Sequence, residues 1–162
     1  MINPALAPRH LLGVYKAELL DTVTFVAKEL GYTNAMFVHG LDGLDEISLL
    51  GKTRINHLKN GSVTTLEIAP EDFGLARCSI SDIKTSKPGV NAETNRGVFS
   101  GKITDAKRSA ILLNAAGALV VGGKASDFQA GIALAGELID SGAATQKLQA
   151  LKEMSHSFGK SA

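Results

Sequence analysis

The sequence has little cysteine, no excess of charge of either sign and no long apolar run, and each shortage argues against a class of protein. Cys78 is the only cysteine, so no disulfide can form within the chain, which fits a reducing compartment. Seventeen basic and sixteen acidic residues give a net charge of +1, without the basic excess of nucleic-acid-binding proteins. No apolar run reaches the length of a membrane-spanning helix, about 18–20 residues, and the amino terminus lacks a signal-peptide pattern. We therefore expect a cytoplasmic protein that binds neither nucleic acid nor a membrane.

What is present is an ordinary globular composition. The chain has 162 residues, of which 44% are hydrophobic and 20% charged, as in a compact domain or a part of a larger one. Small and polar residues dominate the carboxyl-terminal end. We therefore expect one α/β unit over residues 1–155 and a flexible tail over residues 156–162.

The first 40 residues carry the pattern of a strand, a helix and a second strand. Leu11–Tyr15 and Ala35–Val38 are short apolar runs that indicate buried strands. Between them, apolar residues from Leu19 to Leu30 recur at helical spacing, and Gly31 stands where a helix ends. Short connections around one helix make a βαβ unit, so the two strands are predicted to be parallel.

The rest of the chain indicates a hairpin followed by helices. Thr53–Lys59 and Ser62–Ile68 flank Asn60-Gly61, a dipeptide that favours the positive φ angles of a tight turn. Ser79–Val90 is predicted to be irregular, and the chain beyond it to be almost entirely helical. Ala110–Val121 is apolar nearly all round apart from Asn114, which predicts a buried central helix. The predicted fold is α/β, with a partial doubly wound sheet containing parallel strands and a helical carboxyl-terminal region.

The loop over Leu41–Gly51 carries the strongest chemical signal, because it follows the carboxyl end of a predicted parallel strand, where α/β sheets bind ligands. Asp45 and Glu46 offer adjacent carboxylates, and Mg²⁺ commonly takes one or two carboxylates together with water and phosphate oxygens. The alternative is a solvated acidic turn, in which Asp42 bonds its own backbone.

Other polar residues favour structural roles. Cys78 has no histidine nearby in the sequence, which favours an unreactive thiol. His39 suits a hydrogen bond at the strand end better than a ligand contact. Asn114 is expected to satisfy a neighbouring backbone or side-chain group. Lys107-Arg108 fits an exposed helix start better than a pairing with acids or with phosphate. No catalytic or cofactor-binding residue is assigned.

The chain resembles the anthranilate phosphoribosyltransferases in segments that follow the family's order from Asn3 to about Leu151. The matching segments are Gly13-Val14-Tyr15, His39-Gly40 with Asp42-Gly43-Leu44-Asp45-Glu46, Pro70–Leu75, Asn91-Ala92, Leu112–Ala116 and Ile139–Ala143. Two stretches depart from the family: Thr85–Val90 lacks its glycine-rich, acidic character, and Lys107-Arg108-Ser109 replaces a common Arg-Asp pair.

The resemblance implies transfer of a phosphoribosyl group from phosphoribosyl pyrophosphate to the amine of anthranilate, a step of tryptophan biosynthesis. It also implies that Asp45 and Glu46 are ligands of Mg²⁺, which stabilises the departing pyrophosphate. The chain therefore looks like the carboxyl-terminal half of such an enzyme, with phosphoribosyl pyrophosphate and anthranilate as its substrates.

The sequence does not contain the family's amino-terminal helical domain, its glycine-rich pyrophosphate loop, its lysine- and asparagine-containing segment or its anthranilate-contacting arginine. We therefore expect a fragment or half of a split enzyme that is inactive alone. One alternative is a non-catalytic half-domain that needs a partner chain, either the missing amino-terminal half or a second copy in a homodimer. Another is a relative of the pyrimidine nucleoside phosphorylases, although the Asp45-Glu46 pair favours the phosphoribosyl branch.

Overall fold

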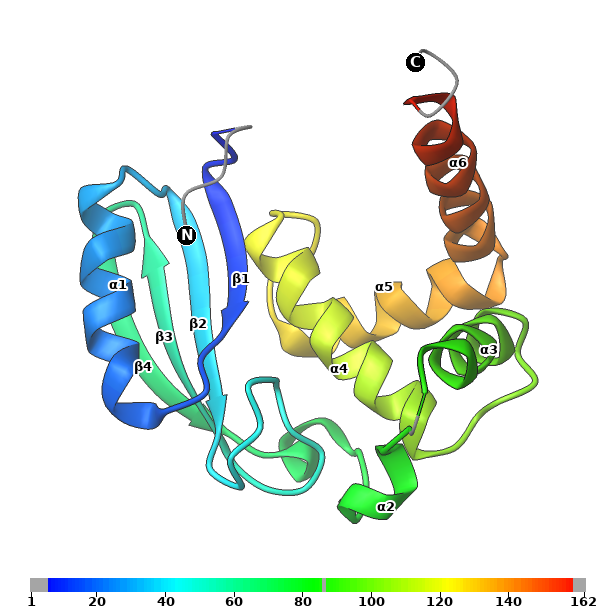
Figure 1. Cartoon of the computed structure of the whole chain (residues 1–162). Helices are drawn as coiled ribbons and strands as arrows, with labels where there is room; N and C mark the ends of the chain where they lie inside the picture. The colour runs from blue at the N-terminus through cyan, green and yellow to red at the C-terminus, as the bar shows by residue number, and fades with distance from the viewer. Residues whose placement is uncertain (1–5, 86, 159–162) are drawn as a thin grey trace.

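A computed structural model of the chain describes residues 6–85 and 87–158 and shows a four-stranded sheet with helices on both faces (Figure 1). The strands are β1 (Arg9–Gly13), β2 (Asn34–Gly40), β3 (Thr53–Lys59) and β4 (Ser62–Ile68). The α-helices are α1 (Leu20–Glu29), α2 (Ile80–Ile83), α3 (Pro88–Phe99), α4 (Ala106–Val121), α5 (Phe128–Asp140) and α6 (Ala143–Ser157). Two 3-10 helices, η1 (Ala17–Leu19) and η2 (Pro70–Phe73), lie between them. No helix of the described ranges is long and apolar enough to cross a membrane, and the cytoplasmic location stays a prediction.

The strands lie in the order β1-β2-β3-β4, with β1 parallel to β2 and the other two pairs antiparallel. Both predicted features, the parallel pair and the hairpin at Asn60-Gly61, are confirmed. The turn residues have φ angles of 50° and 78°, as the dipeptide predicted. The predicted bounds of the first strand are wrong by two residues, because Tyr15 has left the sheet and is exposed while Arg9 already pairs with Asn34.

Alternate side chains of β2 enter two separate cores. Ala35 and Phe37 pack with Leu58 and with α1, whereas Met36 and Val38 pack with Ile55 and with α4. The period of two residues along a strand produces this division. The sheet therefore separates an α1 layer from an α4 layer, and the loop that follows β2 lies at the carboxyl ends of β1 and β2 (Figure 1).

The central helix α4 begins at Ala106, four residues before the predicted start, because the Asp105 side chain caps it by accepting from the Lys107 backbone N–H at 2.9 Å. Its burial is one-sided rather than complete: Leu113, Ala116, Gly117 and Val121 are buried and Ala118 is exposed. The helix contacts the sheet on one side and α5 on another, which leaves the remaining side partly open.

The prediction of an irregular segment over Ser79–Val90 is wrong. Ser79 and Asp82 form a capping box that starts α2, with the Asp82 carboxylate accepting from the Ser79 backbone N–H at 2.7 Å. Hydrogen bonds from the Ser79 hydroxyl and backbone lower the pKa of Asp82. Pro88 then occupies the first position of α3, where its missing N–H has no cost.

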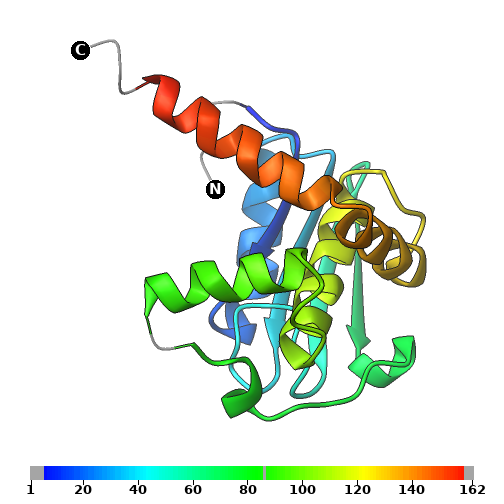
Figure 2. The same cartoon turned by 90° about the vertical axis from the view of Figure 1, so that its right-hand side faces the viewer.

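The two carboxyl-terminal helices differ in how they are held. The Asp127 side chain caps α5 by accepting from Ala130 N–H at 2.9 Å, and Gly131 lies directly against Ala116 of α4. Helix α6 contacts only α5 and α3 closely and extends away from the sheet (Figure 2). It continues to Ser157, so residues 156 and 157, expected in the flexible tail, are helical, whereas positions 159–162 lie outside the described residues.

Candidate metal-binding site

The acidic loop, residues 41–52, leaves the carboxyl end of β2 and returns to the sheet at β3, beside the carboxyl end of β1 (Figure 1). Its two ends are closed on each other, because the Leu41 N–H donates to the Lys52 carbonyl at 2.8 Å. The loop therefore lies at the sheet edge where the sequence predicted a ligand site.

Asp42 shapes the loop and is not a free ligand. Its Oδ1 accepts from the Leu44 N–H at 3.0 Å, and its Oδ2 accepts a short hydrogen bond from the Ser48 hydroxyl. The same hydroxyl accepts from the Leu50 N–H at 2.9 Å. Asp42 therefore plays the local turn role that its position in the sequence suggested.

Asp45 and Glu46 are both exposed, and neither carboxylate has a hydrogen-bond or ion-pair partner among residues 6–85 and 87–158. Their oxygens are therefore free to bind a cation from solvent. The three residues that follow, Ile47, Ser48 and Leu49, are almost completely buried. The two exposed acids are therefore followed directly by a buried segment of the loop, Ile47–Leu49, which we call its buried base.

The base of the loop is tied to α4 by Asn114. The Asn114 Oδ1 accepts from the Ile47 N–H at 3.0 Å, and its Nδ2 donates to the Ile47 carbonyl at 2.9 Å. The expectation that Asn114 satisfies a neighbouring group is confirmed, but the identity of the neighbour, 67 residues away, could not be predicted from the sequence.

Gly13, which lies in a segment that matches the family, lets the loop approach β1. A Cβ atom at this position would lie 1.6 Å from the Asp45 carbonyl oxygen, which no side chain can tolerate. Gly40 at the end of β2 is similarly crowded, because its Cβ would lie 2.8 Å from Asp42 Oδ1. The loop therefore rests on two glycines, one at the carboxyl end of each parallel strand.

A cavity of about 270 Å³ adjoins the loop, between it and α2, α3 and α4. Its lining includes Glu46, two lysines, Lys84 and Lys107, and the asparagines Asn91 and Asn95; the Lys107 ammonium lies 3.5 Å from an Asp105 carboxylate oxygen. Cationic and amide groups in one cavity with a carboxylate suit an anionic ligand that brings a cation with it.

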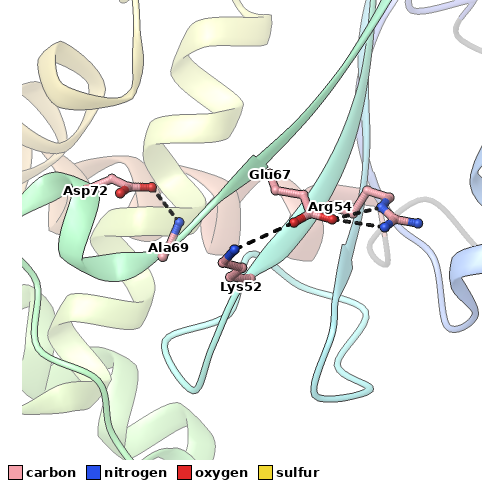
Figure 3. A network of polar contacts seen from close by, with 5 residues as sticks. All are labelled: Lys52, Arg54, Glu67, Ala69 and Asp72. Carbon is pink, nitrogen blue, oxygen red and sulfur yellow. Dashed lines mark hydrogen bonds and ion pairs between the residues drawn. The ribbon is translucent and has the colours of Figure 1, made fainter.

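The returning end of the loop is braced by ion pairs on the hairpin (Figure 3). Glu67 of β4 accepts from Arg54 at 2.9 Å and lies 3.9 Å from the Lys52 ammonium. Beyond β4, Asp72 accepts from the Ala69 N–H at 2.7 Å and so fixes the turn into η2. These pairs are partly exposed and each contributes little to stability, but together they fix where β3 begins.

Two further candidates have structural roles, as the sequence favoured. The ring of His39 is buried, and its Nδ1 hydrogen-bonds the Val14 carbonyl at 2.7 Å. Burial, together with the negative charge of Asp82, raises the pKa of the Cys78 thiol. A raised pKa disfavours the thiolate, which argues against a nucleophile.

Lys107-Arg108 lies at a helix start, as predicted, but the prediction that this start is exposed is wrong. The Arg108 side chain is only 15% exposed, and its Nη2 bonds both carboxylate oxygens of Asp140 at 2.9 and 3.0 Å. Lys107 is 26% exposed and lines the cavity. The packing of α4 against α5 and α2 covers both residues, which a local charge pattern cannot reveal.

The donor set fits Mg²⁺ in part. Carboxylate oxygens are the hard ligands that this ion prefers, and Mg²⁺ usually keeps waters or phosphate oxygens in its remaining positions. No group of three or more His, Cys, Asp or Glu side chains within the described part of the chain could enclose an ion. The residues present therefore suit a shared site, completed by a ligand's phosphate oxygens, rather than a closed protein cage.

The class of protein follows from a family match: residues 1–145 match the glycosyl transferase family a/b domain. The chain belongs to that family. Its similar relatives are anthranilate phosphoribosyltransferases, as the resemblance implied. The enzyme of Desulfosudis oleivorans is 42% identical over 159 residues, which are 98% of this chain and 47% of that protein. That of Methanobrevibacter smithii is 43% identical over 157 residues, 97% of this chain and 47% of its own length.

A solved structure of the same kind supports the fold. The anthranilate phosphoribosyltransferase of Saccharomyces cerevisiae in complex with PRPP and Mg superposes with a TM-score of 0.78 at 30% identity, over 87% of this chain and 41% of that one. The chain thus spans about half the length of the curated relatives that it matches. This agrees with the expectation that the family's amino-terminal domain lies outside the sequence.

Proposed function

We propose that this chain forms the carboxyl-terminal part of an anthranilate phosphoribosyltransferase and that Asp45 and Glu46 are its magnesium ligands. One observation carries the proposal: two adjacent, exposed and unpaired carboxylates stand on a buried base at the carboxyl ends of two parallel strands. Support comes from the yeast relative, which was solved in complex with PRPP and Mg.

The substrates that follow from this proposal are phosphoribosyl pyrophosphate and anthranilate, and the product enters tryptophan biosynthesis. Bound Mg²⁺ supplies positive charge that stabilises the departing pyrophosphate. The part of this chain is to hold the ion beside the diphosphate through Asp45 and Glu46, while Lys84 and Lys107 add positive charge across the cavity.

The groups that bind the ribose and the anthranilate belong to the other half of the family's sequence. That half comes from the same polypeptide in a longer form or from a separate partner chain. Two carboxylates and one cavity wall cannot align two substrates, and alignment provides much of the rate acceleration in a transfer reaction. We therefore predict that the chain alone has no measurable turnover, and robust product formation by the purified chain would contradict this.

The proposal is tested by titrating the folded chain with magnesium pyrophosphate in a calorimeter. The variant Asp45→Asn/Glu46→Gln removes both charges and is expected to lose the binding heat. The matched control Glu18→Gln/Glu29→Gln removes two exposed acids, one in η1 and one at the end of α1, outside the acidic loop, and should bind like the wild type. Equal binding by all three proteins, or none by a wild type that is folded by circular dichroism, would refute the metal role.

A further inference from the structure

Asn114 is a polar residue on an otherwise apolar stretch of α4, between the buried Leu113 and Ala116. An amide that enters such a surface costs free energy unless its donor and acceptor are both bonded. Here both are: Oδ1 accepts from Ile47 N–H at 3.0 Å, and Nδ2 donates to the carbonyls of Ile47 at 2.9 Å and Ala110 at 3.1 Å. The side chain therefore pairs with the Ile47 backbone as a neighbouring strand would.

This pairing belongs to a set of contacts that fix three successive peptide units of the acidic loop. The Leu44 carbonyl accepts from the Gly40 N–H of β2 at 2.8 Å, which fixes the unit before Asp45. The Asp45 carbonyl lies against Gly13 of β1, which fixes the unit between the two acids. Asn114 of α4 bonds the Ile47 N–H, which belongs to the unit after Glu46.

Since a peptide unit is planar, fixing the units on both sides of a residue fixes its φ and ψ angles. Asp45 and Glu46 each lie between two fixed peptide units, so their carboxylates move only by side-chain rotation. Two of the three contacts come from the backbone of strands, from Gly40 of β2 and from Gly13 of β1. Only the Asn114 contact comes from a side chain, and only it can be removed without changing the backbone of the sheet.

We propose that Asn114 is a positioning residue for the metal-binding carboxylates, an inference that rests on the proposed function. Mg²⁺ demands nearly ideal octahedral geometry at about 2.0–2.1 Å, so an unrestrained Glu46 backbone weakens its binding. Partners that orient a metal ligand commonly change affinity by about 10–100-fold when they are removed. Asn114 touches neither the ion nor the substrate and acts through the backbone of Ile47.

A purely structural role would make Asn114 only an attachment of α4, but α4 has independent attachments. At its carboxyl end the Asn34 Nδ2 donates to the Val121 carbonyl at 2.9 Å, and the Arg9 guanidinium bonds the Gly122 carbonyl. The Ile47 side chain also packs beside Gly117. The helix therefore stays docked when the Asn114 amide is lost, while the Glu46–Ile47 peptide unit is released.

The test compares three variants of the full chain: Asn114→Ala, Asn114→Leu, which keeps the side-chain volume, and Asn34→Ala. The last removes an asparagine bond to the opposite end of the same helix and is the matched control. Magnesium pyrophosphate affinity is measured by calorimetry, and hydrogen exchange of the Ile47 amide by NMR. Both Asn114 variants should bind about 10–100-fold more weakly and exchange the Ile47 amide faster. Asn34→Ala should lower the melting temperature without changing either quantity.

The outcomes separate this inference from the function on which it rests. Wild-type affinity in either folded Asn114 variant overturns the positioning role and leaves the proposed function standing. An equal loss of affinity in Asn34→Ala shows a general stability effect and overturns it as well. A folded wild type without binding overturns the proposed function and, with it, the role of Asn114.

Discussion

The acidic loop and helix α6 both lie at the surface of the protein, but they obtain their backbone hydrogen bonds from different sources. The loop has no regular structure, and its peptide groups bond to or rest on β1, β2 and α4. Helix α6 satisfies its own backbone, contacts only α5 and α3 closely, and leaves Leu151, Met154 and Phe158 exposed. A regular helix is therefore the loosely attached part, and the irregular loop is the firmly held one.

The largest predicted effect removes the close approach on which the loop depends. Gly13→Ala places a Cβ atom where the Asp45 carbonyl lies, so either β1 or the loop must move. We expect the free energy of unfolding to fall by about 3 kcal/mol, at the upper end for over-packing, with loss of magnesium pyrophosphate binding. Urea denaturation measures the first and calorimetry the second.

A control for this change is Gly89→Ala, since a Cβ atom at position 89 meets nothing within 4 Å and φ there is not positive. It should leave stability unchanged or slightly higher. A wild-type denaturation curve for Gly13→Ala would mean that the loop is free to shift, and the contrast with α6 would then disappear.

The next prediction compares the two helices directly. Leu113 of α4 is completely buried, so Leu113→Ala should lower the free energy of unfolding by about 2–5 kcal/mol. Leu151 of α6 is 62% exposed, so Leu151→Ala should change it by less than about 0.5 kcal/mol. Chemical denaturation of both variants checks the difference, and a large loss for Leu151→Ala would show that α6 is covered in solution.

The smallest predicted effect is a change in how stability depends on pH, caused by His57 near the carboxyl end of α4. Burial, and then the charge of Lys59, lower the pKa of His57 from 6.5, and its Nε2 bonds Asn34, which holds the Val121 carbonyl. The folded state binds a proton on His57 less readily than the unfolded state does. The stability that neutral His57 contributes is therefore fully present above pH 6.5 and is lost as pH falls through the lowered pKa. His57→Gln should flatten the fall of melting temperature below pH 6.5.

Lys59→Gln removes only the second cause of this shift and should flatten the same curve less than His57→Gln does. Differential scanning calorimetry between pH 7.5 and pH 5, at fixed ionic strength, resolves the order of the three proteins. Identical curves for all three would mean that His57 is not protonated during unfolding in this range.

Local signals in the sequence predicted local features well. The bounds of both hairpin strands were predicted because Asn60-Gly61 determines the turn, whereas the imperfect apolar alternation of the arms left the register open until the structure showed it. The acidic loop was placed at a strand end because a βαβ pattern fixes where strands terminate. Asp45 and Glu46 followed from that position and from the family resemblance, and their metal role stays a prediction.

What the sequence could not reveal depends on contacts between distant residues. The apolar run at Leu11–Tyr15 indicates burial, not where the hydrogen-bonded ladder begins, so β1 was misplaced. The burial of Arg108 and the identity of its acidic partner could not be predicted, because Asp140 lies 32 residues away. The Ser79–Asp82 capping box is the exception, since that signal was local and was overlooked.

The closure of the acidic loop at Leu41 and Lys52 has a consequence for protein engineering. Because the two ends are bonded and Gly40 pairs with Thr53 in the sheet, the length of the loop is independent of strand register. Side-chain replacements at the exposed positions 45 and 46 should be tolerated, whereas insertions between Leu44 and Ile47 should not. The segment can therefore serve as an exchangeable cassette, in which the side chains at positions 45 and 46 are varied to select other cations on an unchanged scaffold.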